Sequence, residues 1–343
     1  MEVELSRAEP SSRLPSVISS VGFLLIPGFA LMSYASAVEP LRAANQIAGR
    51  ELYRWWHAAP GDAPAIASNG AAVLPDFSFG AEAEDLNLFL VCAGGNPASF
   101  NDAATFAWLR RLARRDIIIG GISGGPFILA RAGLLNGRSC TIHWEHGPAF
   151  EETFPNIELT RSLFKLDDKR VTCSGGIAGL DMMVALIERD HGHELSAAVS
   201  DWFLHTHVRE GIGPQRMDLR FRLGVANEKL LAALMAMESN IETPLAREEV
   251  AAIAELSLRQ LERAFKGHLG RGVHEHYLAL RFARARQLLR ESSLPILDVA
   301  LATGFGSASH FARAFRQAFG ISPTDARQQD QPRQTDWALT RQA

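Results

Sequence analysis

The last hundred residues of this 343-residue chain contain one pattern twice, about fifty positions apart. The pair Val250-Ala251 recurs as Val299-Ala300, and five later positions of the first copy match five of the second. The matching residues are Leu261, Arg263, Phe265, Lys266 and Gly270 in the first copy, and Phe311, Arg313, Phe315, Arg316 and Gly320 in the second. A helix, a turn and a second helix, repeated in this way, indicate a duplicated helix-turn-helix, which typically lays one helix in a DNA groove.

The second helix of each copy is predicted to bury one face and expose the other. Apolar residues recur at helical spacing, and these are Leu258, Leu261 and Phe265 in the first copy and Phe311 and Phe315 in the second. The exposed faces carry hydrogen-bonding groups for DNA, namely Arg259, Gln260, Arg263 and Lys266 in the first copy and Ser307, Ser309, His310, Arg313 and Arg316 in the second. Arginine pairs with guanine and glutamine with adenine, whereas Lys266 and Arg316 suit phosphate oxygens.

The two copies differ at the turn and are joined by a long helical segment. Gly304 occupies the second turn, where a left-handed backbone is usual, and Glu255 occupies the first at a cost of roughly 1 kcal/mol. A helix over residues 273–290 would be roughly 27 Å long at ~1.5 Å per residue. Successive major-groove faces lie roughly 34 Å apart, so the two copies suit adjacent turns of one duplex. A helical bundle that binds another protein is the alternative interpretation.

Residues 240–327 resemble the DNA-binding domain of the AraC/XylS family of bacterial transcription activators. The resemblance rests on L-S-L-R-Q-L-E-R-A-F from Leu256, on R-F-A-R-A-R-Q-L-L from Arg281, and on A-T-G-F-G-S-A-S-H-F-A-R-A-F from Ala302. The sequence departs from the family at the first turn and at Val273, where the family often has a proline. The resemblance implies an activator that binds promoter or operator DNA and acts on RNA polymerase, with its DNA-binding domain spanning 240–328.

The length and charge of the chain imply a second domain of different character. A chain of 343 residues exceeds what a double helix-turn-helix needs, so at least two domains are expected. The net charge of the whole chain is −3, yet residues 241–327 carry +3 and the remainder −6. This asymmetry fits a DNA-facing module joined to an acidic domain. The small positive charge favours a homodimer that binds two half-sites.

Other features of the sequence exclude several classes of protein. The chain lacks both a long apolar run and a basic-then-apolar amino terminus, so a cytoplasmic protein with no membrane partner is expected. Residues 1–15 and 329–343 are polar and are predicted to be disordered tails. The scattered Cys92, Cys140 and Cys173 have no metal-like spacing, and no nucleotide-binding motif occurs. Neither a metal nor another cofactor is therefore expected.

Residues 16–194 are predicted to form a doubly wound α/β domain with a parallel sheet. Apolar segments predict strands at 17–26, 85–93, 117–122 and 139–143, and helical spacing predicts helices at 33–48, 99–115, 124–132 and 176–191. Strands without alternation are typical of a sheet that is covered by helices on both faces. Residues 195–239 are predicted to be a helical linker, in which Gln215-Arg216 contacts either one domain or the other.

The sharpest chemical feature of this domain is G-I-S-G-G at residues 121–125, which fits the G-x-S-x-G turn that presents a nucleophile above a sheet. As a catalytic site, Ser123 would need His143 as a base, oriented by a carboxylate such as Glu145 or Asp181. Because no Ser…acid…His order is evident, a ligand-binding turn is favoured over a catalytic or a purely structural one. The sequence therefore predicts a protein that is not an enzyme, with a Ser-dependent amidase or hydrolase as the alternative.

Residues 17–190 resemble the class I glutamine amidotransferase-like domain that is fused to AraC-type DNA-binding domains in one group of regulators. The resemblance rests on F-L-L-I-P-G-F from Phe23, on L-L-N-G-R-S-C-T-I-H-W-E from Leu134, and on S-G-G-I-A-G-L-D-M-M from Ser174. Enzymatic relatives carry cysteine where this chain has Ser123, so the resemblance implies a sensor domain. Members of this group resemble sensors of small amino acids or methylated amines, which implies such an effector here.

An effector of this kind needs contacts for an amine and for a carboxylate. An amine favours aromatic faces and a carboxylate, which Trp144 and Glu39 are placed to supply, although a tryptophan more often packs in a core. The backbone after Ser123 would receive the carboxylate of the effector. The predicted effector contacts are Glu39, Gly95, Ser123, Gly124, His143 and Trp144.

Overall fold

The computed structural model describes residues 17–81, 85–115, 117–167 and 169–329. The chain forms two compact units, Met1–Gln215 and Arg216–Ala343. The division falls inside the predicted linker rather than at either of its predicted ends. Apart from Gln329, the predicted terminal tails lie outside the described residues.

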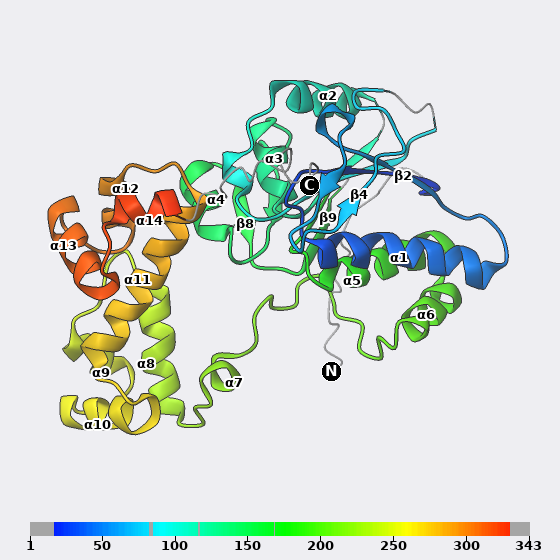
Figure 1. Cartoon of the computed structure of the whole chain (residues 1–343). Helices are drawn as coiled ribbons and strands as arrows, with labels where there is room; N and C mark the ends of the chain where they lie inside the picture. Colours follow the sequence, from blue (N-terminus) through cyan, green and yellow to red (C-terminus); the bar gives the residue numbers. More distant parts are fainter. Residues whose placement is uncertain (1–16, 82–84, 116, 168, 330–343) are drawn as a thin grey trace, which may run out of the picture. The chain divides into compact units, whose positions relative to one another are not determined.

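A six-stranded sheet forms the centre of the first unit, with the strand order β2-β1-β5-β6-β10-β9 (Figure 1). Its strands are β1 (Ser20–Leu25), β2 (Arg54–Ala58), β5 (Leu88–Ala93), β6 (Ile118–Ser123), β9 (Phe164–Asp167) and β10 (Arg170–Cys173). All neighbouring strands are parallel except β10 and β9. Every residue of β1, β5 and β6 is buried, which explains their continuous apolar sequences. The predicted doubly wound fold is confirmed, although the sequence did not predict β2, β9 or β10.

Helices cover both faces of this sheet, as Figure 1 shows. One face carries α1 (Leu31–Ala48), α5 (Ala178–His191) and α6 (His193–Trp202), and the other carries α2 (Ala103–Arg114) and α3 (Gly125–Arg131). Side chains such as Phe23, Leu41 and Met182 are fully buried between β1, α1 and α5. Since the sheet is held between two helical layers, its loops are the parts free to bind a ligand.

Shorter elements lie outside the main sheet. They are the paired strands β3 (Ala65–Ile66) and β4 (Ala72–Val73), the paired strands β7 (Ser139–Thr141) and β8 (Glu158–Thr160), and α4 (Gly147–Thr153). The strand predicted at 139–143 is therefore shorter than expected and belongs to a separate two-stranded sheet. It ends at Thr141 because Ile142 and His143 turn back toward the end of β6, where the His143 N–H donates to the Ser123 carbonyl oxygen at 3.3 Å.

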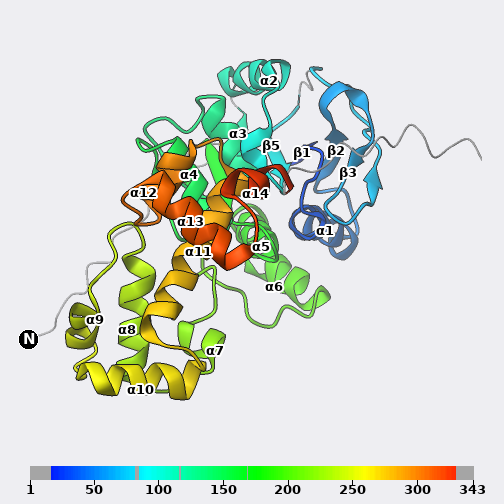
Figure 2. The ribbon, with the colours of Figure 1, turned by 60° about the vertical axis from the view of Figure 1, so that its left-hand side comes forward.

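The second unit is built from helices in its described part. They are α7 (Leu219–Leu223), α8 (Glu228–Ser239), α9 (Arg247–Ile253), α10 (Leu258–Leu269), α11 (Val273–Glu291), α12 (Ile296–Ala302), α13 (Ala308–Phe319) and α14 (Pro323–Gln329). The long helix α11 joins a group formed by α8, α9 and α10 to a group formed by α12, α13 and α14 (Figure 2). The predicted connecting helix is thus confirmed to within one residue. No helix in the described ranges has the length and apolar character needed to cross a membrane.

Each helix group has its own core. The first buries Leu230, Leu234, Val250, Leu261 and Phe265, and the second packs together the rings of Phe282, Phe305, Phe311, Phe315 and Phe319. The predicted inward positions are confirmed with one exception, because Leu258 is 43% exposed in the first turn of α10. The burial of one face of α10 and of α13 leaves the opposite faces open.

Both helix-turn-helix turns are left-handed, which the sequence predicted for Gly304 and left open for Glu255. The φ angle is 50° at Glu255 and 75° at Gly304. Glu255 is held by Lys229, whose ammonium group donates to the Glu255 carbonyl oxygen at 3.1 Å and pairs with its carboxylate at 3.3 Å. At Gly304, a Cβ atom would lie 2.5 Å from Pro244 Cγ and 2.8 Å from the Ile241 carbonyl oxygen. Only the second turn therefore needs glycine for space as well as for backbone conformation.

Candidate nucleic-acid interface and effector site

The two candidate DNA-reading helices start with serine caps. The Ser257 hydroxyl accepts a hydrogen bond from the Gln260 N–H at 3.3 Å, and Gln260 Oε1 accepts one from the Ser257 N–H at 2.9 Å. In the second copy the Ser307 hydroxyl accepts a hydrogen bond from the His310 N–H at 3.2 Å. Gln260 and Ser307 thus stabilise the helix starts, and their contacts with DNA stay a prediction. The S-x-x-Q spacing could have indicated this capping role.

The cationic side chains predicted to contact DNA lie on the open faces of these helices. Five of them are exposed and make no hydrogen bond or ion pair within the described residues, and these are Arg259, Arg263, Lys266, Arg313 and Arg316. Ser309 and His310 are also exposed, and the His310 ring packs edge-on against Phe305 at 5.5 Å. Exposed cations that make no hydrogen bond or ion pair are available to neutralise phosphates or to donate to base edges.

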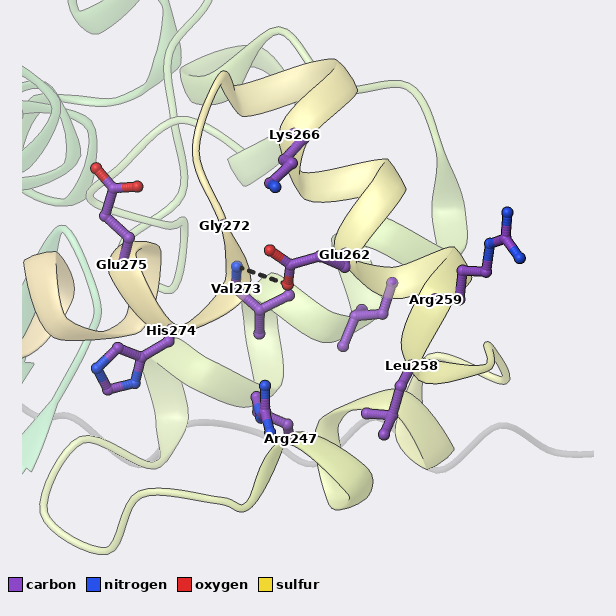
Figure 3. A pocket seen from close by; sticks show the side chains of 10 residues that line it. Arg247, Leu258, Arg259, Glu262, Lys266, Gly272, Val273, His274 and Glu275 are labelled. Atoms are coloured by element: carbon purple, nitrogen blue, oxygen red, sulfur yellow. Dashed lines mark hydrogen bonds between the residues drawn. The ribbon is translucent and has the colours of Figure 1, made fainter.

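A pocket of about 540 Å³ lies beside α10 and receives residues from three helices (Figure 3). Arg247 comes from α9, Arg259 and Lys266 from α10, and His274 from the start of α11. Glu262 also lines it, and its carboxylate accepts a hydrogen bond from the Val273 N–H at 3.3 Å, which caps α11. The sequence pattern did not predict Arg247 or His274, because they come from helices other than the predicted reading helix.

A second hollow of about 450 Å³ lies on α13. It is lined by Ser309, Ala312, Arg313, Arg316 and Gln317. Three of these positions, Ser309, Ala312 and Arg316, follow Arg259, Glu262 and Lys266 by fifty residues. The duplication therefore extends from the sequence to the surface, with one hollow on each reading helix.

In the first unit, Ser123 forms the strained turn that G-x-S-x-G predicts. It ends β6 with a φ of 59°, which is rare for a residue other than glycine, and it is 4% exposed. The next residue, Gly124, donates its N–H to the Ala93 carbonyl oxygen at the end of β5 at 3.0 Å. Gly95 follows β5 at the same edge of the sheet. Strained backbone of this kind is concentrated at functional sites.

His143 reaches this edge through its backbone rather than through a catalytic hydrogen bond. Within the described residues the Ser123 hydroxyl makes no hydrogen bond, so no serine–histidine pair is formed. Burial lowers the pKa of His143 to about 4, with a smaller contribution from His146, so its imidazole is uncharged at neutral pH. Its ring lies 5.4 Å from that of Trp144, and its Nδ1 lies 4.0 Å from Glu145 Oε2. The arrangement suits ligand binding better than acyl transfer.

The surroundings of Ser123 also include the loop after β10 and the first turn of α1, which the sequence did not indicate. The Gly176 N–H donates to the Ser33 hydroxyl at 2.7 Å, which ties the loop after β10 to the first turn of α1. A Cβ atom on Gly175 would lie 2.7 Å from Ser123 Cβ, so this loop passes directly against the serine. The S-G-G sequence at 174–176 could have indicated that this loop passes close to another part of the backbone.

Glu39 does not have the environment that the sequence suggested. It lies in α1 with 43% of its side chain exposed, and its carboxylate pairs with Arg42 at 2.6 Å. Glu39 therefore has a partner on the protein surface without a ligand, and its contact with the effector stays a prediction. Glu145, next to Trp144 and His143, is the carboxylate that the structure brings to this group.

Comparisons with known proteins agree with both units. A model described as the DJ-1/PfpI family matches residues 19–189, and one described as a helix-turn-helix domain matches residues 250–329. The HTH-type transcriptional regulator GlxA of Rhizobium meliloti is 46% identical over 90% of this chain and 96% of its own length. This chain belongs to that family of HTH-type transcriptional regulators.

Another relative of this regulator is the HTH-type transcriptional regulator GbdR of Pseudomonas aeruginosa, which is 42% identical over 93% of this chain and 86% of its own length. The solved structure of an AraC family transcriptional regulator from Pseudomonas putida is 23% identical and covers 54% of this chain and 99% of its own, with a TM-score of 0.49. Both resemblances drawn from the sequence are confirmed. The regulator joins a DJ-1/PfpI, glutamine amidotransferase-like domain to an AraC-type DNA-binding domain. The DJ-1/PfpI fold includes enzymes, but the relatives that match almost the whole chain are regulators.

Proposed function

We propose that this regulator is a homodimeric, cytoplasmic activator whose affinity for promoter DNA is set by a small zwitterion bound beside Ser123. The observation that carries the proposal is the strained serine turn, whose hydroxyl makes no hydrogen bond within the described residues, next to the uncharged His143. Such a turn can bind a ligand without transforming it. The active dimer presents four reading helices to two half-sites and recruits RNA polymerase.

In this proposal the effector contacts come from the loops at one edge of the sheet. Gly95 and the Ser123 hydroxyl receive the carboxylate, since the Gly124 N–H is already bonded to the Ala93 carbonyl oxygen, while Trp144 offers an aromatic face to the amine. Glu145 supplies the negative charge that Glu39 was predicted to supply. Amino acids and methylated amines, including quaternary amines, have this combination of groups.

The test is a thermal-shift screen of amino acids and methylated amines on the full-length protein, repeated with Ser123→Ala. We expect a compound that raises the melting temperature of the wild type and binds the variant more weakly, because one hydrogen bond contributes about 1 kcal/mol. DNA binding without effector should be equal in the two proteins. Conversion of any compound into a product by the wild type but not by the variant would instead support an amidase or hydrolase.

Arg313 is expected to read a base in the second half of the DNA site. Arg313→Ala should cost about 1–3 kcal/mol on the preferred sequence and less on a site altered at one base pair, because a bidentate contact to guanine is lost. Competition binding with a library of single-base variants measures this. An equal loss on every sequence would show that Arg313 contacts a phosphate.

Arg247 is expected to contact a phosphate beside the first reading helix. Arg247→Gln should lower DNA affinity by a similar factor on all sequences and reduce the slope of log K against log salt by about one unit. The matched variant Arg247→Lys keeps the charge and should keep the slope. An unchanged slope in Arg247→Gln would remove Arg247 and its pocket from the interface.

A further inference from the structure

The segment that leads out of the first unit is fastened to that unit at three points. The buried Asp181 carboxylate accepts hydrogen bonds from His205 Nε2 at 2.8 Å and from Arg209 Nη2 at 2.5 Å. Further along, the Gly211 carbonyl oxygen accepts a hydrogen bond from the Leu163 N–H at 2.7 Å. The last fastening is Gln215, the final residue of the unit.

Gln215 is bound through one side-chain nitrogen. Its Nε2 donates to Thr141 Oγ1 at 3.0 Å, to the Ile142 carbonyl oxygen at 3.0 Å and to the Ser162 carbonyl oxygen at 2.8 Å. The sequence left open which domain Gln215 contacts, and these bonds assign its side chain to the first unit. The side chain thus holds the chain against the end of β7 at the position where the first unit stops.

The Ile142–His143 peptide group lies between Gln215 and Ser123. Its carbonyl oxygen accepts the hydrogen bond from Gln215 Nε2, and its N–H donates to the Ser123 carbonyl oxygen. A peptide group is planar and rigid, so its C=O and N–H must rotate together. Any displacement of the His143 N–H that follows a change at Ser123 therefore also moves the acceptor of Gln215.

The attachment of Gln215 is incomplete in one respect. Its Oε1 is buried and has no hydrogen-bond partner within the described residues. A buried acceptor without a donor is destabilising, so this side chain gains from any rearrangement that gives Oε1 a donor or exposes it to water. The fastening at Gln215 is therefore easier to release than a fully satisfied one.

We propose that Gln215 is the positioning residue through which the state of the Ser123 site reaches the DNA-binding unit. A ligand that binds beside Ser123 rotates the Ile142–His143 peptide group. This rotation strengthens or breaks the hydrogen bond from Gln215, and the residues that follow Gln215 are then held against the first unit or released from it. The inference rests on the proposed function, because it assumes that ligand binding at Ser123 controls DNA binding. Asp181 and Gly211 keep the rest of the segment in place, so release is confined to its end.

The test uses a double-mutant cycle on the full-length protein and needs no known effector. DNA affinity is measured for the wild type, His143→Ala, Gln215→Ala and the double variant, with Glu210→Gln as an exposed control in the same segment. We expect His143→Ala to change DNA affinity about fivefold when Gln215 is present and by less than about twofold when it is absent. Glu210→Gln should leave the effect of His143→Ala intact. Equal effects of His143→Ala in both backgrounds would overturn the inference.

A second measurement keeps Gln215 in place, so it does not depend on the folding of the Gln215→Ala variant. The side-chain amide signals of Gln215 are recorded by NMR in the wild type and in His143→Ala. A shift of these signals, together with faster exchange of their protons, is expected, and unchanged signals would contradict the coupling. Wild-type protein that fails to bind any DNA would count against the proposed function, whereas additive effects on DNA binding would count against Gln215 alone.

Discussion

Gly304→Ala is expected to destabilise the second helix-turn-helix by roughly 2–4 kcal/mol, because two penalties add at this position. The backbone φ of 75° is unfavourable for alanine, and the new Cβ would lie within 3 Å of Pro244 and of the Ile241 carbonyl oxygen. Neither neighbour is the flexible end of a side chain, so the turn itself must move. DNA affinity should fall sharply, as measured by titration of a labelled promoter fragment, while the first unit keeps its fold.

The first turn provides a matched control for this prediction. Glu255 already has a side chain at a φ of 50°, so Glu255→Ala should change stability by less than about 1 kcal/mol, mainly through the lost pair with Lys229. Comparable losses in the two variants would mean that the contacts around Gly304 do not determine its cost. Urea unfolding followed by the circular dichroism of the helices measures both.

Asp181→Asn is expected to lower the free energy of unfolding of the first unit by roughly 3 kcal/mol, since it leaves Arg209 without its charged partner. The Asp181 side chain is completely buried and accepts four hydrogen bonds, from His205 Nε2 and from the backbone N–H, Nε and Nη2 of Arg209. The amide cannot accept at both of its polar atoms. Guanidinium unfolding followed by tryptophan fluorescence reports on this unit, which contains five of the six tryptophans.

A surface carboxylate serves as the control for Asp181. Asp167 pairs with Arg138 at 3.4 Å and is 38% exposed, so Asp167→Asn should cost no more than about 1 kcal/mol. If Asp181→Asn and Asp167→Asn unfold at the same denaturant concentration, the Asp181 contacts do not stabilise the unit. The difference in unfolding free energy between the two variants thus compares a buried network of hydrogen bonds with a solvent-exposed ion pair of the same charges.

Local patterns were sufficient wherever burial or backbone conformation determines the residue type. The all-apolar β5, the helical spacing of α11 and the glycine in the second turn each predicted the observed structure. The strand β2 was missed because its sequence R-W-W-H-A lies at the edge of the sheet and is only partly buried. Strands β9 and β10 were missed because they are short, with four residues each.

The candidate sites were harder to predict, because most of their contacts join residues far apart in the sequence. Gln215 binds carbonyl groups more than fifty positions away, and no spacing rule indicates such a partner. Arg247 and His274 reach their pocket from helices that flank the predicted reading helix. The ion pair of Glu39 with Arg42 is local, since the two residues are one helical turn apart, and the sequence analysis did not anticipate it.

In the proposed complex with DNA, the unequal hollows on α10 and α13 would give the DNA target a direction. Glu262 projects a carboxylate into the first hollow, whereas its counterpart Ala312 leaves the second without an acidic group. The Glu262 carboxylate caps α11 and repels phosphate, so we expect the two short DNA segments read by α10 and α13 to differ in sequence. Reversing such a half-site end for end would present each segment to the wrong reading helix, so we expect the reversed site to bind this protein more weakly.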